Sequence, residues 1–284
     1  MKYLYIVFVL VLLFPTTAQA SSTSSGEAPN NSTEGITADY PSIPGYGIIG
    51  SYGYGSYVVN LESWNLYYPF EGKTYFAGDF SNRDSHNLYV LDYHWYTLEK
   101  INIEDYTTEL IGTAQPRVTE EWTGLAFAQN GTAYASATWC GDSSTLYKID
   151  IRTGEIIDAK GVKDSPCLID IEIINGKMYG IDILYDTFIR IDPETGATTV
   201  IGALGFDANY AQGMDYDPIS KTLYYAAWND DTDSAELRTI DIVPGVIASD
   251  GIGITTLIMP INAQMEVIAF PNGLYSTFVP LVKN

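Results

Sequence analysis

The chain has 284 residues, which is enough for one large domain, and its 35 Asp and Glu residues against 14 Lys and Arg give a formal net charge of −21. This balance argues strongly against a nucleic-acid partner, because nucleic-acid binding needs a positively charged surface. It also disfavours anionic membrane surfaces, whereas it is compatible with the binding of cations.

The first 20 residues have the pattern of a secretory signal peptide. Met1-Lys2 leads into the uncharged run Tyr3–Phe14, and Ala18-Gln19-Ala20 fits a cleavage site of the small-x-small type. The apolar run is too short to span a membrane comfortably, and no later segment is a convincing span. We therefore expect a secreted protein, extracellular or periplasmic, with no integral membrane span in the mature chain.

Residues 21–45 are expected to form a flexible linker. Ser21–Gly35 is rich in Ser, Thr, Asn, Glu and Pro, and such a stretch buries too little apolar surface to order itself. The folded domain is then expected to occupy residues 46–284.

Four segments of that domain repeat one pattern at a pitch of roughly 40–55 residues, which is typical of the blades of a β-propeller. In chain order the copies are Thr74–Gly112, Thr123–Gly161, Leu168–Gly202 and Gly213–Ile254. Each contains short runs in which apolar and polar residues alternate, as in half-buried strands. A single four-stranded sheet cannot bury both faces alone, so the copies are expected to stack around an axis.

Turn signals divide each copy into strands. Asn130-Gly131, Asn175-Gly176 and Asn272-Gly273 are two-residue hairpin signals between a first and a second strand. The third strand is Leu146–Asp150 or its equivalents, and the following turn contains Gly154, Gly196 or Pro244-Gly245, where Gly supplies a positive φ.

The two ends of the domain complement each other. Ser56–Gly72 matches the second half of a blade, and Met265–Pro280 matches a first half. Together they predict one composite closing blade, and hence an all-β propeller of five blades with four antiparallel strands each. A six-bladed ring with an unrecognised blade near Tyr40–Ser56 is the alternative, and the regular pitch disfavours an open two-sheet sandwich.

The recurring pattern LYxIDxxTG, preceded by a strand of the type GLAF or GMDY, resembles bacterial and archaeal cell-surface β-propellers with quinoprotein-type and YVTN-type repeats. The matching residues are Leu146–Asp150 with Thr153-Gly154, and Ile189–Asp192 with Thr195-Gly196. The copy at Thr74–Gly112 departs from the pattern, with Asn102 in place of Asp. The resemblance covers nearly all of residues 46–284 and is specific for architecture. The chain lacks a set of dedicated cofactor residues, so the resemblance implies no quinone cofactor.

The two cysteines, Cys140 and Cys167, are expected to form a disulfide. Cys140 follows a second strand and Cys167 lies in the connection to the next blade, and these two kinds of loop share one face of a propeller. Secretion places both in an oxidising compartment. The alternative is a pair of unbonded buried thiols.

Three acidic residues align on the innermost strands. Asp79, Glu172 and Asp215 stand at equivalent positions with Ala126 and Ala269, so alternation along the strands points them to one common side, the central channel in the favoured alignment. Paired carboxylates are the machinery of glycoside hydrolysis. An acidic, water-filled channel is the more conservative interpretation, because no catalytic motif surrounds these acids.

Four aromatic residues lie at or near the junctions between second and third strands: Trp95, Trp139, Tyr185 and Trp228. Exposed aromatic rings on a rigid rim stack on sugars or hold apolar side chains of a partner, whereas buried ones cap the core between blades. Asp230, Asp231 and Asp233 follow Trp228, and an oxygen-rich loop of this kind suits Ca²⁺, although the spacing is not that of an EF-hand. A solvated acidic loop is the alternative.

His86 and His94 are the chain's two histidines, and neither has the neighbours of a zinc ligand or of a catalytic base. The sequence therefore predicts a non-catalytic binding module for a glycan or an extracellular protein. The alternative is an extracellular glycan hydrolase or lyase that uses the channel carboxylates. No cofactor is predicted apart from the candidate Ca²⁺.

Overall fold

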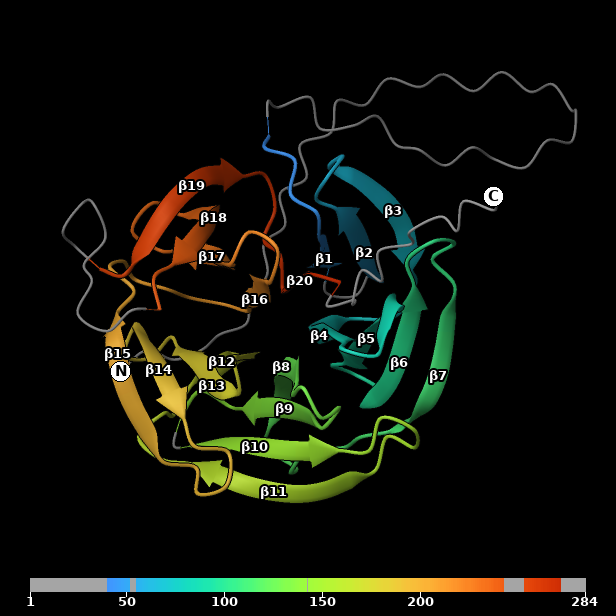
Figure 1. The fold of residues 1–284 in the computed structure, drawn as a ribbon, viewed down its shortest axis with the longest axis horizontal. Coiled ribbons are helices and arrows are strands. Elements are labelled where there is room, and N and C mark those ends of the chain that lie inside the picture. The colour runs from blue at the N-terminus through green and yellow to red at the C-terminus, as the bar shows by residue number, and fades with distance from the viewer. Residues whose placement is uncertain (1–39, 52–54, 142, 243–252, 272–284) are drawn as a thin grey trace, which may run out of the picture.

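The computed structural model describes residues 40–51, 55–141, 143–242 and 253–271, and these residues form 20 strands in five four-stranded antiparallel sheets. The sheets are arranged as blades around one axis, which makes the domain a five-bladed β-propeller (Figure 1). Within the described ranges no helix is long and apolar enough to cross a membrane.

The blades are numbered from the N-terminal one, and each is given from its innermost to its outermost strand. Blade 1 consists of β20 (Val267–Ala269), β1 (Tyr46–Ser51), β2 (Gly55–Asn60) and β3 (Asn65–Phe70). Blade 2 consists of β4 (Tyr75–Ser81), β5 (Asp84–Asp92), β6 (Thr97–Asn102) and β7 (Thr108–Thr113). Blade 3 consists of β8 (Glu121–Phe127), β9 (Ala133–Thr138), β10 (Ser144–Ile149) and β11 (Ile156–Val162). Blade 4 consists of β12 (Leu168–Ile174), β13 (Lys177–Asp182), β14 (Thr187–Ile191) and β15 (Thr198–Ala203). Blade 5 consists of β16 (Gly213–Asp217), β17 (Thr222–Asn229), β18 (Ser234–Ile240) and β19 (Thr255–Ile261).

Blade 1 is the predicted composite blade, because its innermost strand β20 comes from the C-terminal part of the chain and pairs antiparallel with β1. The strand division differs from the prediction: the second strand is β1, not the later part of Met265–Pro280. Residues 272–280 of that segment, with the Asn272-Gly273 signal, lie outside the described residues. The six-bladed alternative is wrong, because the residues near Tyr40–Ser56 supply this second strand rather than a further blade.

The glycines of β1 concealed it in the sequence. A Cβ on Gly47 would lie 2.4 Å from the sulfur of Met265, which packs on this strand where it meets β20. A larger residue at this position would therefore require the Met265 side chain to move, and Gly lowers the strand propensity of the segment. A strand rich in Gly lacks the alternating pattern by which the other strands were recognised.

The turns follow the sequence signals in part. Asn175-Gly176 is a two-residue hairpin with positive φ at both residues, 51° and 74°, as a type I′ turn requires. Asn130-Gly131 instead belongs to a wider turn, in which the Ala128 amide donates to the Thr132 carbonyl at 2.9 Å. Only Gly131 of that pair has a positive φ.

The turn after the third strand has one conformation in four blades. It begins at Asn60, Asn102, Asp150 or Asp192, and the side-chain oxygen of that residue accepts a hydrogen bond from the amide two residues later. The residue four positions on has a positive φ and donates its amide to the carbonyl of the first residue. Asn therefore replaces the Asp of the repeat without loss, because both side chains provide the accepting oxygen.

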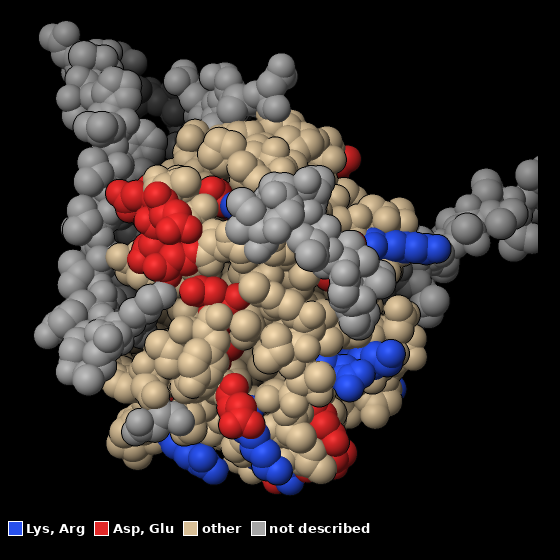
Figure 2. Space-filling model, turned by 90° about the vertical axis from the view of Figure 1, so that its left-hand side faces the viewer, with Lys and Arg blue, Asp and Glu red and all other residues tan. Residues whose placement is uncertain are grey.

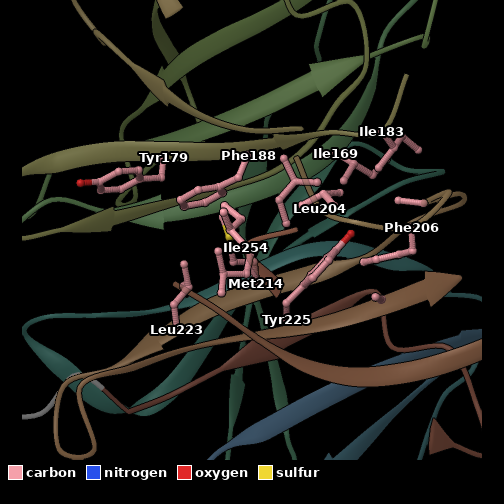
Figure 3. Packing of buried hydrophobic residues seen from close by; sticks show 14 of the residues in the cluster. Ile169, Tyr179, Ile183, Phe188, Leu204, Phe206, Met214, Leu223, Tyr225 and Ile254 are labelled. Atoms are coloured by element: carbon pink, nitrogen blue, oxygen red, sulfur yellow. The ribbon is translucent and has the colours of Figure 1, made fainter. Parts of the chain in front are cut away.

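The core consists of apolar layers between neighbouring blades. Figure 3 shows the layer between blades 4 and 5, where Tyr179 and Phe188 of one blade face Met214, Leu223 and Tyr225 of the other. The rings of Tyr179 and Phe188 stack with centroids 5.3 Å apart. Such layers supply most of the apolar burial that holds the ring together.

Residues just before β1 also pack on the propeller. Ile43 is buried in the layer between blades 1 and 5, and the Trp64 indole donates to the Pro41 carbonyl at 2.9 Å. The part of residues 21–45 that the structure describes is thus attached to blade 1.

Candidate functional site

One face of the propeller carries the loops between second and third strands together with the connections between blades, and we call it the loop face. Cys140 and Cys167 meet on this face and form a disulfide, with their Cα atoms 4.1 Å apart. The prediction from blade topology is confirmed. The bond joins the β9–β10 loop of blade 3 to the segment that leads into blade 4.

The four aromatic candidates differ in exposure. Trp95, Trp139 and Tyr185 occupy equivalent loops of blades 2, 3 and 4, and their exposed fractions are 63%, 59% and 59%. Trp228 lies within β17 and is half-buried, and its indole donates to Asp230 at 3.0 Å. The structure therefore places three of the candidates on the rim and attaches the fourth to its own blade.

Two buried aspartates that the sequence analysis did not single out hold these loops. Asp92 ends β5, and its carboxylate accepts the amides of Trp95 at 2.6 Å and of Thr74 at 3.2 Å. Asp182 ends β13 and accepts the amides of Tyr185 and Cys167 in the same way. In the sequence, both residues could have been recognised as an Asp that directly follows an apolar residue at the end of a second strand. These carboxylates fix the rim because each satisfies several buried donors at once.

A cavity of about 510 Å³, counting space open to solvent, lies on the loop face over blades 2 to 4. Its lining is mainly aromatic and aliphatic and comprises Phe76, Tyr93, Glu121, Trp122, Thr123, Thr138, Trp139, Cys140, Ile169, Tyr210 and Ala211. Trp139 is the one predicted binding residue that lines it. Sequence reasoning missed the cavity because its walls come from six separate segments of the chain.

Asp79, Glu172 and Asp215 lie near one another on the inner strands, together with Asp170, which the alignment did not include. Asp79 accepts two amides, from Phe80 of its own strand at 2.6 Å and from Phe127 of the next blade at 3.0 Å. Asp170 and Asp215 make the same bridges from blade 4 to blade 5 and from blade 5 to blade 1. The inner strands are therefore joined by carboxylates.

These four carboxyl groups are 2–6% exposed, and burial raises the pKa of each well above its ordinary value. For Asp215, burial raises the pKa to about 8, although hydrogen bonds from two amides and with Glu172 act in the opposite direction. Repulsion from Asp215 adds to the effect of burial on the pKa of both Asp79 and Glu172. The group therefore retains protons at pH values where exposed carboxyls are ionised.

The acidic loop after Trp228 is held by protein donors. Asp230 accepts a hydrogen bond from the Asn209 amide group at 2.7 Å, and Asp231 accepts the Asp207 amide at 3.1 Å. Among the described residues, no three His, Cys, Asp or Glu side chains are grouped so that they could hold a metal ion. Figure 2 shows Asp and Glu side chains gathered on part of the flank that lies on the left of Figure 1.

The histidines belong to blade 2. His86 lies near Glu104, with 3.8 Å between its Nε2 and the carboxylate oxygen, and both side chains are exposed. His94 lies in the β5–β6 loop, where its amide donates to Asp92 at 2.8 Å.

Comparison with solved structures places the chain among β-propellers. A protein of unknown function from Bacteroides thetaiotaomicron matches with a TM-score of 0.55 at 12% identity, over 86% of this chain and 68% of that one. A protein of unknown function from Bacteroides caccae matches with a TM-score of 0.48 at 10% identity, over 80% and 98% of the two chains. A glutaminyl cyclase from Myxococcus xanthus matches with a TM-score of 0.46 at 17% identity, over 71% and 95%.

Neither a protein-family model nor a curated protein matches the sequence. At these identities the structural likeness concerns the fold alone, and a propeller hosts many unrelated functions. The class that the structure defines is thus the five-bladed β-propeller, and any function has to be argued from the site.

Proposed function

We propose that this protein is a secreted or cell-surface, non-catalytic binding module that takes a glycan or an extracellular protein on its loop face. The observation that carries the proposal is the exposure of Trp95, Trp139 and Tyr185 on equivalent loops of three consecutive blades. Large rigid rings on a fixed scaffold provide contact area at low cost in conformational entropy. The cavity beside Trp139 gives the same face a concave element.

The location rests on two observations. Residues 1–20 have the pattern of a signal peptide, and Cys140 and Cys167 form a disulfide of the kind that persists in oxidising compartments. The −21 net charge favours a soluble surface that repels nucleic acid and anionic lipid.

The axial carboxylates favour a binding role over hydrolysis. Asp79, Asp170 and Asp215 each have both carboxylate oxygens occupied by backbone amides, and their side chains are almost fully buried. A glycosidase needs two carboxyl groups that reach the scissile bond from either side. The carboxylates of this site serve the ring itself.

A glycan-array screen with and without Ca²⁺ tests the proposal, followed by titration of the best ligand against Trp95→Ala, Trp139→Ala and Tyr185→Ala. Each variant on the contact surface should weaken binding by about 1–3 kcal/mol, as for other aromatic anchors. Ile219→Ala is the matched control, because Ile219 is 62% exposed in the loop between β16 and β17 on the opposite face.

Three results would count against the proposal: no ligand among glycans and extracellular proteins, equal weakening by the Ile219 control, or loss of folding in all three rim variants. If ligand binding depends on Ca²⁺ and this dependence disappears in Asp230→Asn and Asp231→Asn, the acidic loop after Trp228 would be established as a metal site. Turnover of a glycan that Asp79→Asn or Asp215→Asn abolishes would instead establish the hydrolase.

A further inference from the structure

The cavity on the loop face contains one carboxylate with unused hydrogen-bonding capacity. The Oε1 atom of Glu121, at the start of β8, accepts a hydrogen bond from the Tyr96 hydroxyl at 3.2 Å. Its Oε2 is buried and has no hydrogen-bond partner among the described residues. A buried acceptor left unsatisfied is unfavourable, so such a group in a cavity is a place where a ligand donor is favoured.

The two hydroxyl groups of the threonines in the lining are already engaged. Thr123 donates to the Leu168 carbonyl at 2.8 Å, and Thr138 donates to the Pro166 carbonyl at 2.9 Å. In the part of the chain that the structure describes, Glu121 is the only acidic residue that lines the cavity. The negative charge available to a ligand there is therefore concentrated on one side chain.

Aromatic rings make up much of the remaining wall: Phe76, Tyr93, Trp122, Trp139 and Tyr210. The faces of such rings carry partial negative charge and attract ammonium groups, most strongly where water is excluded. A single carboxylate among several rings is thus complementary to a positively charged group on a small apolar body.

We propose that this cavity binds a small organic ammonium ion, whose N–H group pairs with Glu121 and whose carbon body packs against Trp139. The proposal rests on the proposed function only in that both place a ligand on the loop face. Burial raises the pKa of Glu121, which marks a site of low polarity where an ion pair is stronger than in water. The net charge of −21 raises the local concentration of cations around the molecule.

Titration of the full chain with n-butylammonium chloride tests the proposal, with 1-butanol as the neutral probe of similar size. Tryptophan fluorescence and calorimetry report binding. We expect saturable binding of the ammonium ion, and we expect the alcohol to bind at least about tenfold more weakly. Glu121→Gln should weaken ammonium binding about tenfold and leave the alcohol unchanged, and Trp139→Ala should weaken both.

Glu62→Gln is the charge-matched control, because it also removes one negative charge but lies in an exposed turn on the opposite face. It should leave both titrations unchanged. Equal binding of the two probes, equal effects of Glu121→Gln and Glu62→Gln, or the absence of saturable ammonium binding would overturn the proposal. If that titration fails but a glycan ligand binds the wild type and is lost in Trp139→Ala, the proposed function stands while the ammonium site fails.

Discussion

Gly154 shows why the repeat contains Thr-Gly after its third strand. Its φ is 78°, and a Cβ there would lie 2.9 Å from the carbonyl carbon of Gly112 on the outermost strand of the preceding blade. A Cβ on Gly112 would in turn lie 1.8 Å from the Thr153 carbonyl oxygen. The turn of one blade therefore touches the backbone of its neighbour, and the motif encodes an inter-blade contact as well as a turn.

We expect Gly154→Ala to lower the free energy of unfolding by about 2 kcal/mol or more, because it adds a steric clash to an unfavourable positive φ. Gly176→Ala is the control, since Gly176 has φ 74° and nothing within 4 Å of the added Cβ. Gly176→Ala should lower the free energy of unfolding only through the unfavourable positive φ, by about 1 kcal/mol. Denaturant unfolding measures both, and equal losses would mean that the contact with Gly112 contributes nothing.

Asp182 is a second residue whose role is larger than its place in the repeat indicates. Its carboxylate accepts the Ser165 hydroxyl at 2.7 Å and the amides of Cys167, Leu184 and Tyr185. Asp182→Ala leaves these buried donors unsatisfied, so we expect a loss of about 3 kcal/mol or more in unfolding free energy. Asp192→Ala, in an exposed turn, should cost no more than about 1 kcal/mol, and similar losses for the two variants would contradict this assignment.

The closing strand β20 is the element on which the ring depends. It is three residues long, yet it pairs with β1 and completes blade 1, and its side chains enter the layers on both sides of that blade. The disulfide is the other feature that joins distant segments, since it connects residues 27 positions apart. Strand β20 acts on the open edge that a linear array of blades would have, whereas the disulfide holds two consecutive blades together.

Deletion of residues 265–284 should therefore unfold the domain in one cooperative step, because blade 1 loses its inner strand and the ring opens. Deletion of residues 272–284 retains β20 and should leave the domain folded. Circular dichroism and thermal melting distinguish the outcomes. A melting transition unchanged by the longer deletion would show that β20 does not hold the ring closed.

Replacement of both cysteines by alanine should lower the unfolding free energy by about 3 kcal/mol in the chain-entropy account. The wild-type protein, denatured without a reductant, should show no reactive thiol in a titration. Detection of two thiols, or full stability of the double variant, would contradict a structural role for the bond.

At the scale of the whole molecule, the axial carboxyls set a pH dependence. The pKa of Asp215 is raised to about 8 in the folded protein, against an ordinary value near 4 in the unfolded chain. Between these values the folded state holds a proton that the unfolded state has released, so stability falls as pH rises from about 4 to about 8. The pKa values of Asp79, Asp170 and Glu172 are raised in the same direction.

We therefore expect the midpoint of denaturant unfolding to be higher at pH 5 than at pH 8. Asp215→Asn does not titrate and should reduce the difference between the two pH values, whereas Glu62→Gln should not change it. The pKa values of Asp105, Asp150 and Asp192 are lowered in the folded protein, so these groups change the stability only at pH values below this range. Stability that increases from pH 5 to pH 8 would disprove the assignment.

The sequence predicted the blades more fully than the site. The periodic copies gave the five blades, and the loop positions of Cys140 and Cys167 gave the disulfide, because strand order alone determines the face of each loop. Strand β1 escaped recognition because two of its six residues are glycines, and the contacts at those positions come from Met265 and Glu266, which are distant in sequence. The cavity around Glu121 escaped for a similar reason, since no single repeat contains more than part of its wall.

The bridges of Asp79, Asp170 and Asp215 also limit the number of blades. Each short side chain reaches from its own inner strand to a backbone amide of the next, so the bridge depends on the spacing between neighbouring inner strands. A duplicated sixth blade would widen the axis and move these amides out of reach, leaving each buried carboxyl with only the amide of its own strand as a donor. Among the described residues, three of the five junctions between blades carry such a bridge, so the axial acids are suited to a ring of this circumference.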